Sequence, residues 1–148
     1  MGHAAGVTPV MWLPTGHKGD DVISADLPPI AAAVVLDGPM RIADFVGVDQ
    51  AVCRQPVIAT MMGGAPAQVP ARYAMLDPLA NKPKVQRLLV VDGALPDPDP
   101  ALIEGLRAQG IAVEVIRVAQ DQHFNHLVPG TRDFAAIGPA LLDIAGGR

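Results

Sequence analysis

The sequence has one cysteine, no long hydrophobic run and little charge. With Cys53 alone among 148 residues, no disulfide can form within the chain. The longest uninterrupted apolar run, residues 30–36, is far shorter than the roughly 20 residues that a membrane-spanning helix needs. Residues 1–3 do not lead a basic segment into an apolar one, as a signal peptide would. We therefore expect a cytoplasmic chain without a membrane segment.

The charge balance argues against a nucleic-acid-binding protein. The formal net charge is −4, whereas a nucleic-acid surface needs clustered positive charge. Half of the residues are hydrophobic, which is enough for a packed core. The length suits one domain, and we expect residues 1–148 to form it.

Three apolar, β-branched runs predict strands, at residues 30–36, 85–91 and 111–118. The first two are apolar nearly throughout, which is typical of strands buried on both faces. The third alternates apolar and polar residues, which favours an edge strand.

Helical patterns separate these runs. Residues 100–109 place Leu102, Ile103 and Leu106 on one face, and residues 133–145 repeat apolar residues at helical spacing. Residues 51–81 are less regular and suggest a cap-like connection with a short helix or two. Strands that alternate with helices predict an α/β fold with three mainly parallel strands.

Residues 2–6, Gly-His-Ala-Ala-Gly, have the outline of a nucleophile elbow, G-x-S-x-G, with Ala4 in the serine's place. This motif reverses the chain sharply from a strand into a helix, and larger neighbours than glycine would clash there. We expect residue 4 to lie at the turn and the backbone N–H of Ala5 to face a developing oxyanion.

A general base and its acid can be placed on later loops. His123 follows the third predicted strand, where a base would lie in this architecture. Asp97 and Asp99 follow the second strand, and the carboxyl ends of parallel strands carry functional groups. Asp99 suits the cap of the helix that starts near Pro100, so we assign Asp97 as the acid and leave Asp99 open.

These segments together resemble the second half of small esterases of the α/β-hydrolase fold, related to bacterial kynurenine formamidases. The resemblance starts at the elbow, similar to G-H-S-A-G-G, and continues through residues 33–39 and 63–79. It ends at the acid strand and at residues 122–124, Gln-His-Phe. It implies hydrolysis of a small ester or amide by a Ser-Asp-His triad, without a metal or cofactor.

Three departures bear on activity. Ala4 has no nucleophilic atom, the family's H-G-G oxyanion segment is not in this sequence, and its H-G-x-x-D acid motif is one residue longer here. The chain is therefore a fragment without catalysis, a pseudoenzyme that binds or scaffolds, or a serine-to-alanine variant of an active enzyme. In this fold a strand precedes the elbow at the sheet centre, and without it the strand at residues 30–36 would have an unpaired apolar edge. We therefore expect the chain to be oligomeric, bound to a partner such as the family's N-terminal half, or poorly soluble.

Two further side-chain patterns bear on metal binding and thiol chemistry. His123 and His126 form H-x-x-H, but no convincing third ligand follows, so we expect no metal. Cys53 is expected to be a buried structural cysteine.

Overall fold

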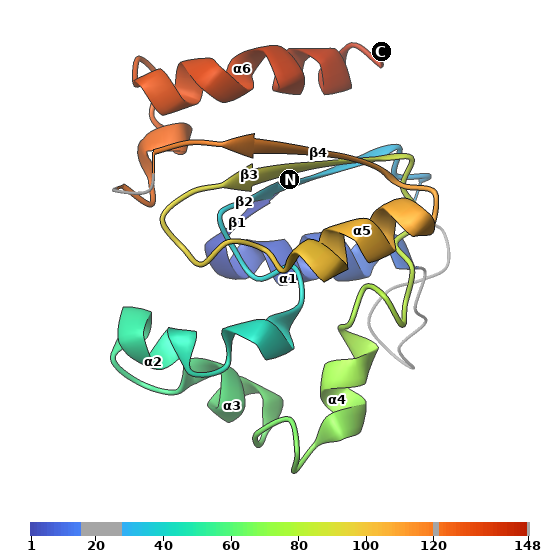
Figure 1. The fold of residues 1–148 in the computed structure, drawn as a ribbon, viewed down its shortest axis with the longest axis vertical. Helices are drawn as coiled ribbons and strands as arrows, with labels where there is room; N and C mark the ends of the chain where they lie inside the picture. The colour runs from blue at the N-terminus through green and yellow to red at the C-terminus, as the bar shows by residue number, and fades with distance from the viewer. Residues whose placement is uncertain (16–27, 120–121, 148) are drawn as a thin grey trace.

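Four parallel strands form the centre of the fold (Figure 1). The computed structural model describes residues 1–15, 28–119 and 122–147. The strands are β1 (Gly2–His3), β2 (Ala32–Leu36), β3 (Arg87–Asp92) and β4 (Ala112–Arg117), and they lie in the sheet in chain order. The α/β class is confirmed, with a fourth strand, β1, added to the three that the sequence predicts.

The burial of the strands follows their sequence patterns. β2 and β3 are buried almost throughout, and they pair in parallel with Val35 opposite Val90. β4 lies at the edge, where Ala112, Glu114 and Arg117 are exposed and Val113, Val115 and Ile116 are half-buried. The two most apolar runs therefore occupy the centre of the sheet, where both faces are covered.

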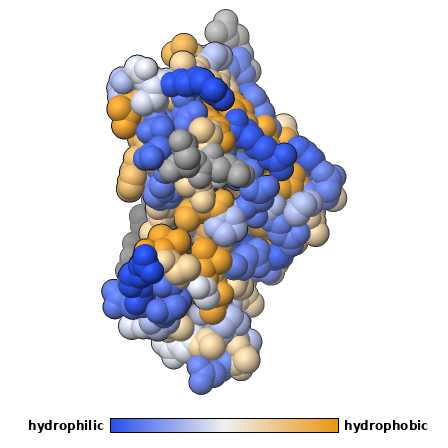
Figure 2. All heavy atoms as spheres, turned by 60° about the vertical axis from the view of Figure 1, so that its left-hand side comes forward, coloured by the Kyte–Doolittle hydropathy of each residue, from blue (hydrophilic) through white to orange (hydrophobic). Residues whose placement is uncertain are grey.

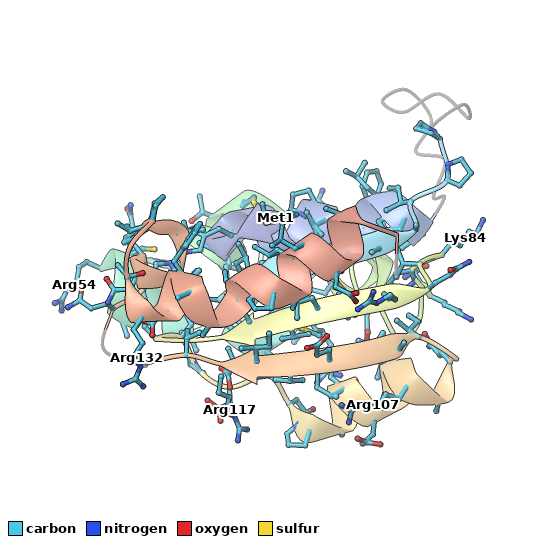
Figure 3. All side chains as sticks on the ribbon, turned by 90° about the horizontal axis from the view of Figure 1, so that it is seen from above. Met1, Arg54, Lys84, Arg107, Arg117 and Arg132 are labelled. Carbon is cyan, nitrogen blue, oxygen red and sulfur yellow. The ribbon has the colours of Figure 1, made fainter. Side chains whose placement is uncertain are left out.

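Helices cover both faces of the sheet. α1 (Val7–Trp12) and α5 (Pro100–Ala108) lie on one face, and α6 (Arg132–Ala145) crosses the other (Figures 1 and 3). Val7, Val35, Leu88 and Leu106 belong to the core on the first face. Ile137 packs with the opposite face of β2 and β3.

Both long helices begin at capped residues. Asp99 accepts a hydrogen bond from the backbone N–H of Ala101, as the sequence indicates for the start of α5. The Thr131 hydroxyl accepts one from the N–H of Phe134 at the start of α6. Short 3₁₀ helices lie in the connections, among them η1 (Ala4–Gly6), η2 (Leu13–Thr15) and η4 (Asn125–Leu127).

The segment between β2 and β3 forms a small helical cluster of its own. It contains η3 (Ile42–Phe45), α2 (Val48–Cys53), α3 (Val57–Met62) and α4 (Pro70–Met75). Ile42, Ile58, Met62 and Tyr73 form its buried centre. In Figure 1 this cluster lies below the sheet, beyond α1. Within residues 51–81, where the sequence predicts a connection with a short helix or two, lie α3, α4 and the end of α2.

β2 is covered along only part of its outer edge. β1 pairs with Val35 and Leu36 at the carboxyl end of β2. In the described parts of the chain, no strand pairs with the outer edge of β2 from Ala32 to Val34.

Among the residues that the structure describes, no helix is long and apolar enough to cross a membrane.

Candidate functional site

The carboxyl ends of the four strands point to the same side of the molecule, because the strands are parallel (Figure 1). Ala4 follows β1, Asp37 follows β2, Gly93 follows β3, and His123 lies on the connection after β4. Four segments that are distant in sequence therefore meet at one edge of the sheet.

Ala4 occupies the sharp turn that the elbow motif predicts. β1 ends at His3, η1 begins at Ala4, and α1 follows at Val7. Ala4 has a φ of 50°, in the left-handed region that residues with a side chain seldom adopt. Such a conformation costs on the order of 1–3 kcal/mol and is frequent at functional turns. A short strand, a residue at positive φ and a helix therefore follow one another directly at this turn.

The glycines around this turn are not equivalent. A Cβ on Gly2 would lie 2.1 Å from the carbonyl oxygen of Gly6, so the close crossing of the chain requires glycine at position 2. Gly6 itself has open space around its Cα and an ordinary helical φ of −68°. The motif predicts that a side chain would clash at both glycines, and in the structure this holds for Gly2 and not for Gly6. A third glycine, Gly38, lies just after β2 and packs closely against the turn. A Cβ added at Gly38 would lie 2.3 Å from the carbonyl oxygen of Ala4.

His123 is hydrogen-bonded to a carboxylate. Its Nδ1 lies 2.6 Å from Oδ2 of Asp37, and the His123 side chain is partly buried. With the proton on Nδ1, the ring donates to Asp37, and Nε2 becomes the acceptor nitrogen. This is the pairing by which an acid orients a general base.

Asp37 is held by the backbone around it. The residue is buried and has a φ of 44°. Its two carboxylate oxygens accept hydrogen bonds from the N–H groups of Ala94 and Leu95, at 3.0 and 2.9 Å. Gly93 makes room for this carboxylate, since a Cβ there would lie 2.9 Å from Asp37 Cγ. Two backbone donors and His123 therefore compensate a buried negative charge.

The two carboxylates chosen from the sequence lie elsewhere. Asp97 is half exposed and lies 3.6 Å from Arg117. Asp99 caps α5 and also pairs with Arg41 at 2.9 Å. The carboxylate beside His123 is therefore that of Asp37 and not that of Asp97, the residue that the sequence predicts for this role. Asp37 follows a buried strand directly, and the rule that selected Asp97 applied equally to it.

Two more histidines surround His123. The His3 ring lies 4.4 Å from the His123 ring between centroids, and its Nε2 lies 3.1 Å from the His123 carbonyl oxygen. The centroid of the His126 ring lies 5.2 Å from that of the His3 ring. Burial lowers the pKa of both His3 and His126. His3, treated as a variable residue in the motif, therefore supports the loop that carries His123.

A cavity of about 550 Å³ opens beside the elbow. Ala4, Ala5 and His123 all line it, so residue 4 and the imidazole face the same space. The remaining wall comes mainly from η3, α2 and α3. Figure 2, which brings the carboxyl ends of the strands forward, shows a group of hydrophobic residues in the middle of this side, bordered by hydrophilic ones.

Cys53 lines the same cavity and is exposed, so the expectation of a buried cysteine is wrong.

His126 is buried, and neither of its ring nitrogens has a hydrogen-bond partner in the described structure. Across residues 1–15, 28–119 and 122–147, no three His, Cys, Asp or Glu side chains are grouped to hold a metal ion.

Comparison with protein-family models, with curated proteins and with solved structures finds no match to this chain. The comparisons therefore assign no family to this small α/β domain with its all-parallel sheet.

Proposed function

We propose that the chain carries the second half of an α/β-hydrolase site for carboxylic esters or amides, with alanine in the nucleophile's place. The observation that carries this proposal is the Asp37–His123 pair beside the strained turn at Ala4. A buried acid, a base and an elbow that share one cavity are the parts that acyl transfer requires.

Each residue has a distinct role in the parent reaction. A serine at position 4 would attack the acyl carbon while His123 Nε2 takes its proton. The imidazolium would then return that proton to the departing alcohol or amine. Asp37 would hold the ring and stabilise its charged form. The Ala5 N–H, in the first turn of a helix, has no acceptor within that helix and would donate to the oxyanion.

The chain as it stands has a methyl group at this position, which cannot form an acyl-enzyme. We propose that it binds an ester or amide without cleaving it. A serine-to-alanine change removes attack but leaves the cavity and the Asp37–His123 pair in place.

Restoring the nucleophile tests the assignment. The variant Ala4→Ser would be treated with a fluorophosphonate, in which the serine oxygen attacks phosphorus, fluoride leaves and the proton passes to His123. We expect one phosphonyl group on residue 4 by mass spectrometry, and faster p-nitrophenyl acetate turnover than with the unsubstituted chain.

The matched control is the double variant Ala4→Ser with His123→Ala, which keeps the hydroxyl but removes the base. Labelling of the single variant at the rate of the double variant would refute the triad assignment. Labelling of the unsubstituted chain at residue 4 is chemically excluded, so it serves as the blank.

A further inference from the structure

We infer that the cavity beside Ala4 takes an uncharged, largely apolar ester or amide and rejects ligands that carry a carboxylate or phosphate. The inference rests on the proposed function for the reacting bond, but the selection against charge follows from the cavity wall itself.

The wall of the cavity is almost entirely apolar. Side chains of Pro39, Ile42, Phe45, Val48, Val57 and Ile58 line it. Its volume of about 550 Å³ lies within the range of small-molecule sites. An aliphatic or aromatic group placed there would leave water without losing hydrogen bonds.

Two polar side chains of the wall, Asp49 and Thr8, already have hydrogen-bond partners. The Asp49 carboxylate accepts hydrogen bonds from the N–H groups of Ile58, Gly47 and Gln50, at 2.7, 2.9 and 3.0 Å. The Ile58 N–H first, and the other donors with it, lower the pKa of Asp49. Asp49 therefore stays negative at neutral pH and would repel an anionic ligand. The Thr8 hydroxyl donates to the carbonyl oxygen of Pro39 at 3.4 Å.

Positive charge is lacking in the wall. Among the described residues that line the cavity, none is lysine or arginine. Arg54, next in sequence to the cavity residue Cys53, extends away from the ribbon at the periphery (Figure 3). A ligand carboxylate would lose its hydration near Asp49 and gain no lysine or arginine as a partner in return.

The single cysteine provides a reporter for the test. Cys53 lines the cavity and is exposed, so its alkylation by iodoacetamide should slow when a ligand occupies the space. The unsubstituted chain would be alkylated in the presence of methyl hexanoate or of hexanoate anion at equal concentration. We expect methyl hexanoate to slow alkylation several-fold and hexanoate to have no effect. Equal protection by the two compounds, or none by methyl hexanoate, would overturn the inference.

A charge variant tests the cause of the selection. Met61 lines the cavity and is 65% exposed, so Met61→Lys adds a cation to the wall without emptying a core position. We expect hexanoate to protect Cys53 in this variant. Leu142→Lys is the matched control, because Leu142 is 71% exposed on α6, across the sheet. If Met61→Lys retains the original preference, charge does not govern the selection and the inference fails.

The two proposals fail separately. Methyl hexanoate protection without labelling of Ala4→Ser would support the apolar binding site and refute the hydrolase assignment. If Ala4→Ser is labelled but methyl hexanoate and hexanoate protect Cys53 from alkylation equally, the result would support the hydrolase site and refute the selection against charge.

Discussion

His123 Nδ1 lies 2.6 Å from Oδ2 of Asp37, although 86 residues separate the two in sequence. The contact forms because β2 and the connection after β4 both end at the same edge of a parallel sheet. Asp37 also accepts hydrogen bonds from Ala94 and Leu95, so three segments of the chain meet at one carboxylate. The Asp37 carboxylate therefore orients the imidazole of the proposed site and also binds the backbone that follows β3.

Replacing Asp37 should impair both the stability of the chain and the reactivity of a restored serine. Asp37→Asn removes a charged acceptor from two backbone N–H groups, and we expect a loss of about 1.5–3 kcal/mol in urea unfolding. In the Ala4→Ser background, phosphonylation should slow on the order of 10⁴-fold, because the imidazole loses its orientation. Asp97→Asn, at a half-exposed ion pair with Arg117, should change stability by less than about 1 kcal/mol. A larger loss of labelling with Asp97→Asn than with Asp37→Asn would reverse the assignment of the acid.

Gly38→Ala should disturb the elbow, whereas Gly6→Ala should not. A Cβ on Gly38 would lie 2.3 Å from the Ala4 carbonyl oxygen, and a backbone atom cannot rotate away as a side chain would. We expect Gly38→Ala to destabilise the chain by about 1–3 kcal/mol in urea unfolding. Gly6→Ala meets open space at an ordinary φ, so its effect should remain within about 0.5 kcal/mol. Similar losses for the two variants would argue against the tight crossing of β2 and the elbow.

Buried histidine should make the chain less stable in mild acid. Burial lowers the pKa of His126 below its ordinary value of 6.5, so the unfolded state binds a proton first as the pH falls. The stability that neutral His126 provides is present above pH 6.5 and is lost as the pH falls from there towards the lowered pKa. We expect the urea midpoint to fall between pH 7.5 and 5, and to fall less for His126→Phe, which cannot be protonated. An identical pH slope for the two proteins would show that His126 does not titrate on unfolding.

The outer edge of β2 should promote self-association or pairing with another chain. In the described structure β1 covers only Val35 and Leu36, and Ala33 and Val34 beyond it are buried and apolar. We expect sedimentation velocity to show a concentration-dependent species larger than the monomer. Ala32→Pro would remove a backbone donor at this edge and should shift the distribution towards the monomer. A single monomeric species of the unsubstituted chain at all concentrations would contradict the prediction.

Local sequence patterns were sufficient to predict most of the architecture. The apolar runs at β2 and β3 and the alternation at β4 indicate their burial, because side-chain periodicity reflects which faces meet water. Asp99 is recognisable as a helix cap, because a cap depends on residues two or three positions away. β1 has only two residues, too few to give a periodic signal of its own.

The pairing of Asp37 with His123 was decided by tertiary structure. Asp37 and Asp97 both follow buried strands, so their local sequences did not distinguish them. The distinction arises from Gly93, whose missing side chain makes room for the Asp37 carboxylate, and from two N–H groups that turn towards it. The apolar cavity likewise depends on how η3, α2 and α3 pack beside the elbow. The sequence by itself determined which segments became strands, helices and turns, because those depend on near neighbours. Only the folded chain determined which side chains met, because such contacts depend on the placement of distant segments.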